Sequence, residues 1–316
     1  MSIHRSKDES SEKNISKTTK RLARSIESGS IVAVRILPVL YCVTALLTAS
    51  QAIAAPAPGT VFKDCPECPE MVVLPAGSFI MGTLEDELGR QPDEGPQHKV
   101  TFAKPFAISR FHVTAKELNA YIKQTGVVIK SGDERPGRWC EASKPSYPQG
   151  PRQPAVCIDY HEVQTYTEWL SKKTGKRYRM VSEAEREYAA RAGSTGPFPF
   201  PFDKEGEYQI DKHANTYGPK DGYSYSSPVG SYPPNAFGVY DMHGNVYEWV
   251  ADCKHPDYVG APTDGSAWID DKNCERAHMR GNDWGESPIF SRSGNRNDRL
   301  KTTRGDFLGF RVVRDL

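Results

Sequence analysis

Cysteines and paired carboxylates are the side chains of this 316-residue chain best suited to chemistry. Seven cysteines are present, six of them after residue 54. Cys65 and Cys68 form a C-x-x-C pair, which suits a short-loop disulfide or one half of a zinc site. Because no second C-x-x-C pair completes a zinc quartet, zinc is not expected.

The first 54 residues predict that the chain is exported. Residues 1–35 are basic on balance, and residues 36–49 form an apolar run of 14 residues, too short to span a membrane comfortably. Ala-Ile-Ala at 52–54 is typical of a cleavage site. We therefore expect a signal peptide or an N-terminal anchor over 1–54. The mature chain would be periplasmic or secreted, and attached to a membrane only if this segment stays uncleaved.

Export changes how the remaining cysteines are interpreted. An even number of cysteines in an oxidising compartment favours disulfides. Neighbours with plausible loop lengths are Cys140 with Cys157 and Cys253 with Cys274, while the connectivity as a whole stays open. The predicted disulfide residues are Cys65, Cys68, Cys140, Cys157, Cys253 and Cys274.

Composition excludes one class of partner. Hydrophobic residues make up 37% of the chain, enough for a buried core. After residue 54, 33 Lys and Arg stand against 36 Asp and Glu. This balance gives no reason to expect nucleic-acid binding.

Three helices are predicted by the same capping pattern, in which a Ser, Thr or Asp is followed three residues later by Glu. The pairs are Thr114 with Glu117, Asp159 with Glu162, and Ser182 with Glu185. The helices should end near Gly126, Gly175 and Gly193. Their apolar faces contain Leu118, Tyr121 and Ile122, then Val163, Tyr166 and Leu170, then Tyr188 and Ala189.

Strand patterns surround these helices. Residues 70–82 read as a hairpin around a Pro-Ala-Gly turn, and residues 98–114 alternate like a strand pair. After residue 194, short apolar pieces alternate with Gly, Pro, Asn and Asp. We expect one loop-rich α+β domain over residues 65–316, preceded by a flexible lead-in at 55–64.

Four stretches carry a resemblance to a known family. They are "VVLPAGSFIMG", "WLSKKTGKRYRMVSEAEREYAARAGS", "SSPVGSYPPNAFGVYDMHGNVYEWVADC" and "GFRVVR". Together they resemble the formylglycine-generating-enzyme, or sulfatase-modifying-factor, family over roughly residues 68–316. The resemblance implies a variant of the C-type-lectin fold. Some members of that family oxidise a sulfatase cysteine to formylglycine, others take part in ergothioneine or pyoverdine biosynthesis, and others bind ligands.

Two loops are candidate calcium sites. Two carboxylates seven residues apart, Asp241 and Glu248, can wrap one ion around a Gly-Asn turn. The resemblance implies that the carbonyls of Gly244 and Val246 complete this frame. It implies a second frame from the side chains of Asn215 and Asp221 and the carbonyls of Thr216 and Tyr223. The alternative is that these turns close without metal through side-chain hydrogen bonds.

The resemblance also shows what is missing. Oxidising members bind Cu(I) through two cysteine thiolates, which soft Cu(I) prefers. In this chain Glu286 and Ser291 occupy those positions, so we assign no catalytic residue and expect neither copper nor formylglycine generation. The histidine motif of the iron-dependent branch is also absent from the sequence.

The altered segment is rich in groups that suit recognition of polar ligands. The segment also resembles that of the family's non-oxidase members, in which this surface is a binding face. The resemblance implies a shallow ligand groove lined by Trp284, Glu286, Ser291, Arg292, Asn295, Arg296, Asn297 and Asp298. The alternative for Arg292 and Arg296 is that they are salt-bridge partners that order the loop. The favoured hypothesis is a calcium-stabilised module that binds a peptide, glycan or protein. The competing hypothesis is a periplasmic maturation oxidoreductase that uses another metal or cysteine pair.

Overall fold

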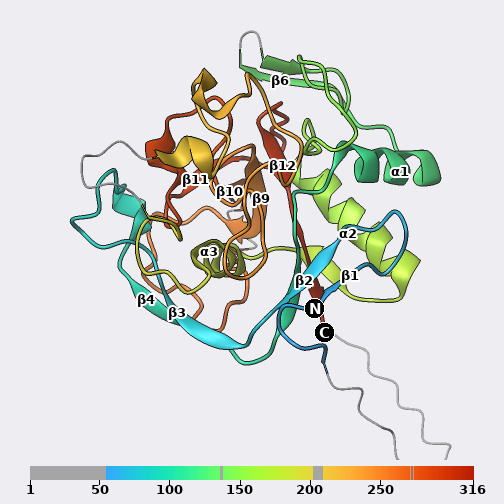
Figure 1. Cartoon of the computed structure of the whole chain (residues 1–316). Helices are drawn as coiled ribbons and strands as arrows, with labels where there is room; N and C mark the ends of the chain where they lie inside the picture. Colours follow the sequence, from blue (N-terminus) through green and yellow to red (C-terminus); the bar gives the residue numbers. More distant parts are fainter. Residues whose placement is uncertain (1–54, 136–137, 202–208, 271, 273) are drawn as a thin grey trace, which may run out of the picture. The chain divides into compact units, whose positions relative to one another are not determined.

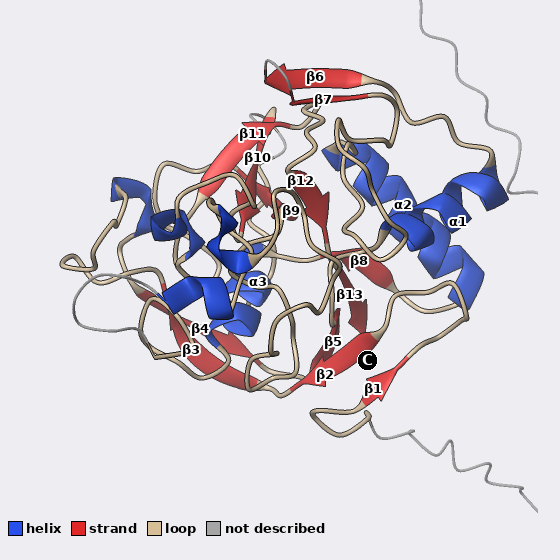
Figure 2. Cartoon of the chain, turned by 45° about the horizontal axis from the view of Figure 1, so that its top comes forward, coloured by secondary structure: helices blue, strands red, loops and turns tan. Residues whose placement is uncertain are grey.

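The larger β-sheet has two strands that are fully buried, and its strands come from both ends of the domain. The computed structural model describes residues 55–135, 138–201, 209–270, 272 and 274–316, all within one compact unit, Ile53–Leu316. The predicted signal peptide or anchor lies outside the described residues. The sheet order is β1 (Val61–Phe62), β2 (Met71–Leu74), β5 (Phe106–Ser109), β13 (Val312–Asp315) and β8 (Tyr178–Met180), and all neighbours are antiparallel (Figure 2).

Strand β1 corrects the expectation of a flexible lead-in at 55–64. Val61 and Phe62 pair with Val72 and Met71. The Gly59 amide also donates to the Val73 carbonyl at 2.8 Å. The Pro-rich composition predicted flexibility, but the exposed edge of β2 offers backbone groups that this segment can satisfy. The folded domain therefore begins before residue 65.

The second sheet positions the segment that lacks the cysteines. Its order is β11 (Asn297–Leu300), β10 (Arg276–Arg280), β9 (Tyr247–Cys253) and β12 (Leu308–Phe310), with β12 parallel to β9. Two hairpins complete the strands: β3 (Gly77–Met81) with β4 (His98–Phe102), and β6 (Gly132–Arg135) with β7 (Arg138–Cys140). Figure 2 shows the β6–β7 hairpin at the top of the view.

Both predicted strand pairs form strands, but the pairings were wrong. β2 joins the larger sheet, whereas β3 pairs with β4 across a long loop. Alternation explains this result: Met71 and Val73 face one core, while Val72 and Leu74 face another. Strand β2 therefore lies between two cores. Residues 75–76 then lead the chain from β2 to β3, which pairs with β4 outside this sheet.

The three helices confirm the capping predictions. α1 (Ala115–Thr125), α2 (Tyr160–Thr174) and α3 (Glu183–Arg191) each begin with a complete capping box. Gly126 and Gly175 end the first two helices in the left-handed conformation, while Ala192, one residue before Gly193, does so for α3. α1 and α2 lie side by side against the sheet end at β8 (Figures 1 and 2).

Helix α3 is unusual because all nine of its residues are buried, although five are charged. It packs between the β3–β4 hairpin and strands β9 and β10. A buried charge needs a partner of opposite sign. The charged side chains of α3 therefore need partners of opposite charge on the neighbouring strands and loops. Within the described residues, no helix is long and apolar enough to cross a membrane.

Candidate functional site

Three buried arginines fix the segment that connects β10 to β11. Arg280, at the end of β10, donates to Glu183 at 2.8 Å and to Glu187 at 2.6 Å, both on α3. Arg296 also binds Glu183, with contacts of 2.8 and 3.0 Å. These guanidinium groups hold the pKa of Glu183 far below its ordinary value, although burial alone would raise it.

Arg292 makes the third link. It contacts both oxygens of Glu94 at 2.7 and 2.8 Å, and Glu87 at 2.7 Å. Glu94 belongs to the short 3-10 helix η1 (Pro92–Glu94), and Asn295 also donates to it at 3.0 Å. The loop between β3 and β4 is therefore tied directly to the segment that the sequence marks as altered.

These contacts correct half of the predicted ligand groove. Ser291, Arg292, Asn295 and Arg296 are buried, and each is bonded inside the protein. The salt-bridge alternative for the two arginines is the one that the structure shows. The acidic partners lie about 100 or 200 positions away, so the local sequence gave no sign of them.

Asn297 and Asp298 lie on β11 and are partly buried. Asp298 pairs with Arg276 and, at 3.0 Å, with Lys254. The Asn297 amide donates to the Tyr247 phenol at 3.4 Å. Both predicted groove residues therefore have protein partners on, or directly after, strands of the second sheet.

The two positions that hold cysteines in oxidising members differ in accessibility. Ser291 is fully buried, and its hydroxyl accepts from the Asn282 side chain at 2.7 Å. Glu286 is half-buried, and its backbone carbonyl accepts from Tyr217 at 3.0 Å. Of these two residues, only Glu286 is partly accessible to solvent.

Three aromatic side chains from different loops meet at Trp284, two residues before Glu286. Trp284 meets Tyr147 at 5.7 Å and Tyr225 at 5.2 Å between ring centroids, both edge to face. Tyr147 and Tyr225 stack on each other at 4.8 Å. We call Tyr147, Tyr225, Trp284 and Glu286 the aromatic face. Sequence reasoning found Trp284 and Glu286 but missed the two tyrosines, whose only signal was their setting in turn-rich loops.

The described cysteines all form disulfides. The pairs are Cys65–Cys68, Cys140–Cys157 and Cys253–Cys274. The predicted neighbour pairings are therefore the ones formed. Trp284 packs against the cluster that contains the Cys140–Cys157 bridge, which supports the aromatic face from below.

The first calcium frame does not fit an ion. Glu248 is fully buried, and its Oε1 lies 2.9 Å from Arg311, 3.2 Å from Arg186 and 3.1 Å from His112. Burial would raise the pKa of Glu248, but the two arginines hold it well below its ordinary value. A divalent ion would add charge to a carboxylate that two guanidinium groups already neutralise.

The second calcium frame fits better. The Asp221 carboxylate accepts from the amides of Thr216 and Tyr223 at 2.8 and 2.9 Å, as in a metal-free turn. However, Asn215 Oδ1 is buried without a hydrogen-bond partner, and burial raises the pKa of Asp221. A buried oxygen without a hydrogen-bond partner, in the same loop as a partly buried carboxylate, is an environment that a cation can stabilise. Asn215, Thr216, Asp221 and Tyr223 would hold the ion.

Histidines do not gather into a metal centre in the described part of the chain, where no group of three or more His, Cys, Asp and Glu side chains is arranged to hold an ion. His243 is buried, and its Nδ1 lies 2.8 Å from the Ser291 carbonyl. Burial lowers the pKa of His243 to about 3, so the ring is neutral near pH 7.

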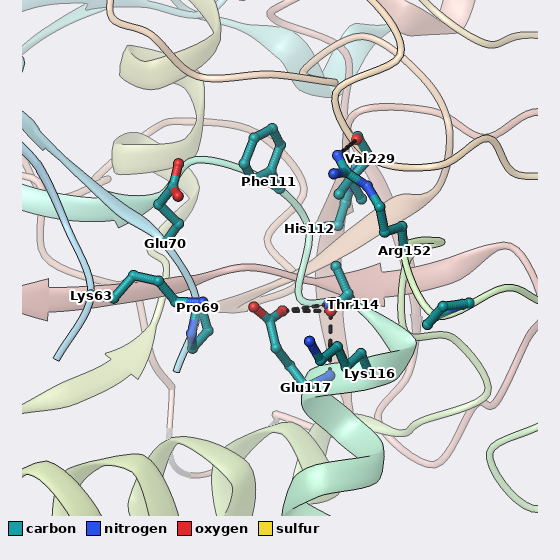
Figure 3. A pocket seen from close by; sticks show the side chains of 11 residues that line it. Lys63, Pro69, Glu70, Phe111, His112, Thr114, Lys116, Glu117, Arg152 and Val229 are labelled. Carbon is teal, nitrogen blue, oxygen red and sulfur yellow. Dashed lines mark hydrogen bonds between the residues drawn. The ribbon is translucent and has the colours of Figure 1, made fainter. Parts of the chain in front are cut away.

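A separate cavity of about 200 Å³ opens at the start of α1 (Figure 3). Lys63, Lys116 and Arg152 surround it, and Thr114 and Glu117 are hydrogen-bonded to each other at one wall. Arg152 is also engaged, because it donates to the Val229 carbonyl at 2.9 Å. The buried His112 lies on the far side, where it contacts Glu248. This cavity is distinct from the aromatic face.

Comparison with known families identifies the fold and its lineage. The Sulfatase-modifying factor enzyme 1-like domain matches residues 57–316. The chain belongs to the sulfatase-modifying-factor family. This membership confirms the predicted α+β formylglycine-generating-enzyme fold with its loop-rich single domain.

Relatives of this sulfatase-modifying-factor protein include active and inactive enzymes. The formylglycine-generating enzyme of Thermomonospora curvata is 28% identical over 221 residues, covering 58% of this chain and 71% of that protein. The inactive Cα-formylglycine-generating enzyme 2 of Mus musculus is 29% identical over 290 residues, covering 78% and 85%. Identity to these two relatives therefore does not decide activity.

A solved structure is much more similar. PvdO from Pseudomonas aeruginosa is 73% identical in sequence, with a TM-score of 0.81. The match covers 83% of this chain and all of the PvdO chain. The resemblance to PvdO thus extends over most of this family member.

Proposed function

We propose that this protein is an exported sulfatase-modifying-factor family member that does not generate formylglycine. The observation that carries the proposal is the pair Glu286 and Ser291 at the thiolate positions. Oxygen ligands hold Cu(I) poorly. The six described cysteines are engaged in disulfides and offer no replacement thiolate.

We further propose that the aromatic face binds a peptide ligand. Tyr225 is 46% exposed, and Trp284 and Glu286 are half-buried, so these groups are available at the surface. Aromatic rings offer contact area with little loss of conformational entropy, and a carboxylate offers hydrogen-bond acceptors. A peptide with aromatic and donor groups matches this combination better than an apolar ligand does.

Similarity to PvdO supports a more specific proposal about which peptide is bound. Because identity is 73% over the whole PvdO chain, we infer that the two proteins do the same work. The family includes members of pyoverdine biosynthesis, so we propose that the bound peptide is a precursor in that biosynthesis. The protein then acts as a periplasmic maturation factor for the precursor, with calcium as a structural ion at Asn215 and Asp221.

Complementation tests this proposal directly. A P. aeruginosa strain that lacks PvdO would receive the full chain, and pyoverdine in the medium would be measured by absorbance. We expect pyoverdine production to return with the wild-type chain and with the exposed-surface variant Lys123→Ala, and to be lost with Trp284→Ala. A wild-type chain that is exported and folded but leaves production absent overturns the shared function.

A second assay tests the absence of formylglycine generation. The purified protein would be incubated with Cu(I), O₂ and a cysteine peptide of the sulfatase type, followed by mass spectrometry. We expect the cysteine to remain unchanged, whereas an active formylglycine-generating enzyme converts it under the same conditions. Conversion by this protein would show that Glu286 and Ser291 do not prevent the reaction.

A further inference from the structure

Two of the disulfide bridges differ in how far solvent reaches their sulfurs. Cys140 and Cys157 are 2% and 0% exposed and pack inside one hydrophobic cluster. Cys253 ends β9 and is fully buried, whereas Cys274, two residues before β10, is partly accessible. Thiol–disulfide exchange begins when a thiolate attacks a sulfur that it can reach. In the Cys253–Cys274 bridge, that sulfur belongs to Cys274.

A lysine ammonium group lies against this accessible sulfur. Lys301 Nζ is 2.7 Å from Cys274 Sγ and 4.4 Å from the centroid of the Tyr160 ring. The backbone holds the lysine here, because its amide donates to the Glu275 carbonyl at 3.0 Å and its carbonyl accepts from the Tyr160 amide at 3.1 Å. A disulfide sulfur is a weak acceptor, whereas a cation stabilises a thiolate. The position of Lys301 therefore favours the reduced form of Cys274.

The buried sulfur of the bridge has a donor too. The Asp270 amide donates to Cys253 Sγ at 3.3 Å. The same loop is fixed by the Cys253 amide, which donates to the Trp268 carbonyl at 3.0 Å. A buried charged sulfur is costly unless it accepts a hydrogen bond. Both sulfurs of this bridge therefore face a group that stabilises them as thiolates.

A surface cavity borders the bridge. Tyr160, whose ring contacts Lys301, and Ile269, the residue before Asp270, both line a cavity of about 510 Å³. Ile269 is 56% exposed. Cavities of a few hundred Å³ are of the size that holds a small ligand. A small thiol reagent therefore has a place to bind beside the bridge.

We propose that Cys253–Cys274 is a thiol-exchange site that accepts two electrons from a dithiol. One thiolate of the dithiol attacks Cys274 Sγ, the S–S bond breaks, and Cys253 leaves as a thiolate that takes a proton from water. The second thiolate of the dithiol then attacks its own sulfur in the mixed disulfide. Cys274 leaves as a thiolate paired with Lys301, and the dithiol ends as a disulfide.

This exchange acts on a loop that supports helix α3. The Gly265 carbonyl accepts from the hydroxyl of Ser182, the residue that caps α3, at 2.8 Å. The Trp268 amide donates to the Asp252 carboxylate at 2.8 Å. Reduction removes the covalent closure of this loop and leaves these hydrogen bonds in place. The exchange goes beyond the proposed function, because it involves neither the aromatic face nor the two positions that hold thiolates in oxidising relatives.

The first test compares two bridges within the wild-type protein. The full chain would be treated with dithiothreitol at pH 7.5 without denaturant. Thiols formed at each time would be trapped with N-ethylmaleimide and located by mass spectrometry after digestion. We expect Cys253 and Cys274 to be trapped at least about tenfold faster than Cys140 and Cys157. Equal rates for the two bridges, or faster reduction of Cys140–Cys157, would overturn the proposal.

Variants of Lys301 separate its charge from a structural role. Lys301→Met should slow reduction of Cys253–Cys274 about tenfold, whereas Lys301→Arg should stay within about threefold of wild type. The matched control is Lys272→Met, which removes an exposed lysine two residues before Cys274 and should leave the rate unchanged. The proposal fails if Lys301→Met reacts at the wild-type rate, or if Lys272→Met slows the reaction as much. Faster reduction of both bridges in Lys301→Met would also overturn it, because a purely structural lysine has that effect.

Discussion

The polar residues in and next to the segment between β10 and β11 fall into a buried half and an accessible half. Arg280, Arg292 and Arg296 are buried against the acids of α3 and of the β3–β4 loop. Trp284 and Glu286 remain at the surface on the aromatic face. The difference teaches that similar polar residues of one loop become buried where a distant element supplies opposite charge, while their neighbours in sequence stay partly accessible.

The largest expected effect comes from breaking the buried half. Arg292→Ala leaves Glu94 buried without its counter-charge and should lower the free energy of unfolding by about 3–5 kcal/mol. Urea denaturation followed by circular dichroism measures this change. The matched control is Arg177→Ala, whose side chain is 77% exposed and should change stability by less than about 0.5 kcal/mol. Equal stabilities of the two variants would mean that the buried pair does not support the fold.

A pH profile sharpens the description of the buried half. Burial, and then the charge of Glu183, raise the pKa of Asp252 from 3.8 to about 7. The folded protein therefore holds a proton that the unfolded chain has released above pH 4. This contribution to stability is full at low pH and is lost as pH rises through about 7.

The neutral histidines act in the opposite direction. Burial lowers the pKa of His243 from 6.5 to about 3, so its contribution to stability is present above pH 6.5 and is lost as pH falls toward 3.

Asp252→Asn removes the titration of Asp252. The difference in free energy of unfolding between this variant and the wild type should therefore change by about 1–3 kcal/mol between pH 5 and 8. Unfolding by urea at each pH measures it, and parallel profiles would contradict the raised pKa.

The accessible half should respond in binding rather than in folding. Trp284→Ala removes the ring that contacts both Tyr147 and Tyr225, and we expect ligand affinity to fall about tenfold or more. Titration with a pyoverdine precursor peptide, followed by Tyr and Trp fluorescence, measures this loss. Trp169→Ala is the matched control, because it removes a Trp on α2 away from the face. Unchanged affinity of Trp284→Ala would remove the aromatic face from consideration.

The smallest expected effect is on the melting temperature, through the loop that contains Asn215 and Asp221. If calcium lies at Asn215 and Asp221, chelation with EGTA should lower the melting temperature by about 2–4 °C, as expected for about 1 kcal/mol. Asp221→Asn should abolish the response, whereas Asp264→Asn, at an exposed turn, should keep it. A response that persists in Asp221→Asn would place the ion elsewhere.

Local sequence signals predicted the helices and the disulfides well. Thr114, Asp159 and Ser182 each begin a helix because the capping interaction involves residues three positions apart. The pairing of Cys140 with Cys157 likewise joins residues close in sequence. These features depend on short-range geometry, which a single sequence contains.

Features that depend on distant partners were predicted poorly. The hairpin expected at 70–82 failed because β2 and β3 find their partners in different layers. The ligand groove was half wrong because Glu94 and Glu183 lie far from Arg292 and Arg296 in sequence. Tyr147 and Tyr225 were missed because nothing near them in the chain indicates that they meet Trp284.

The ion pair between Glu94 and Arg292 has a consequence for the order of assembly. The two residues are 198 positions apart, so Glu94 leaves the ribosome long before its counter-charge exists. Glu183 likewise waits for Arg280 and Arg296, which lie 97 and 113 positions later. A chain that stops before residue 292 therefore contains Glu94 and Glu183 but lacks Arg292 and Arg296, two of the arginines that bind them. These buried carboxylates can be neutralised in this way only after residues 280–296 have been synthesised.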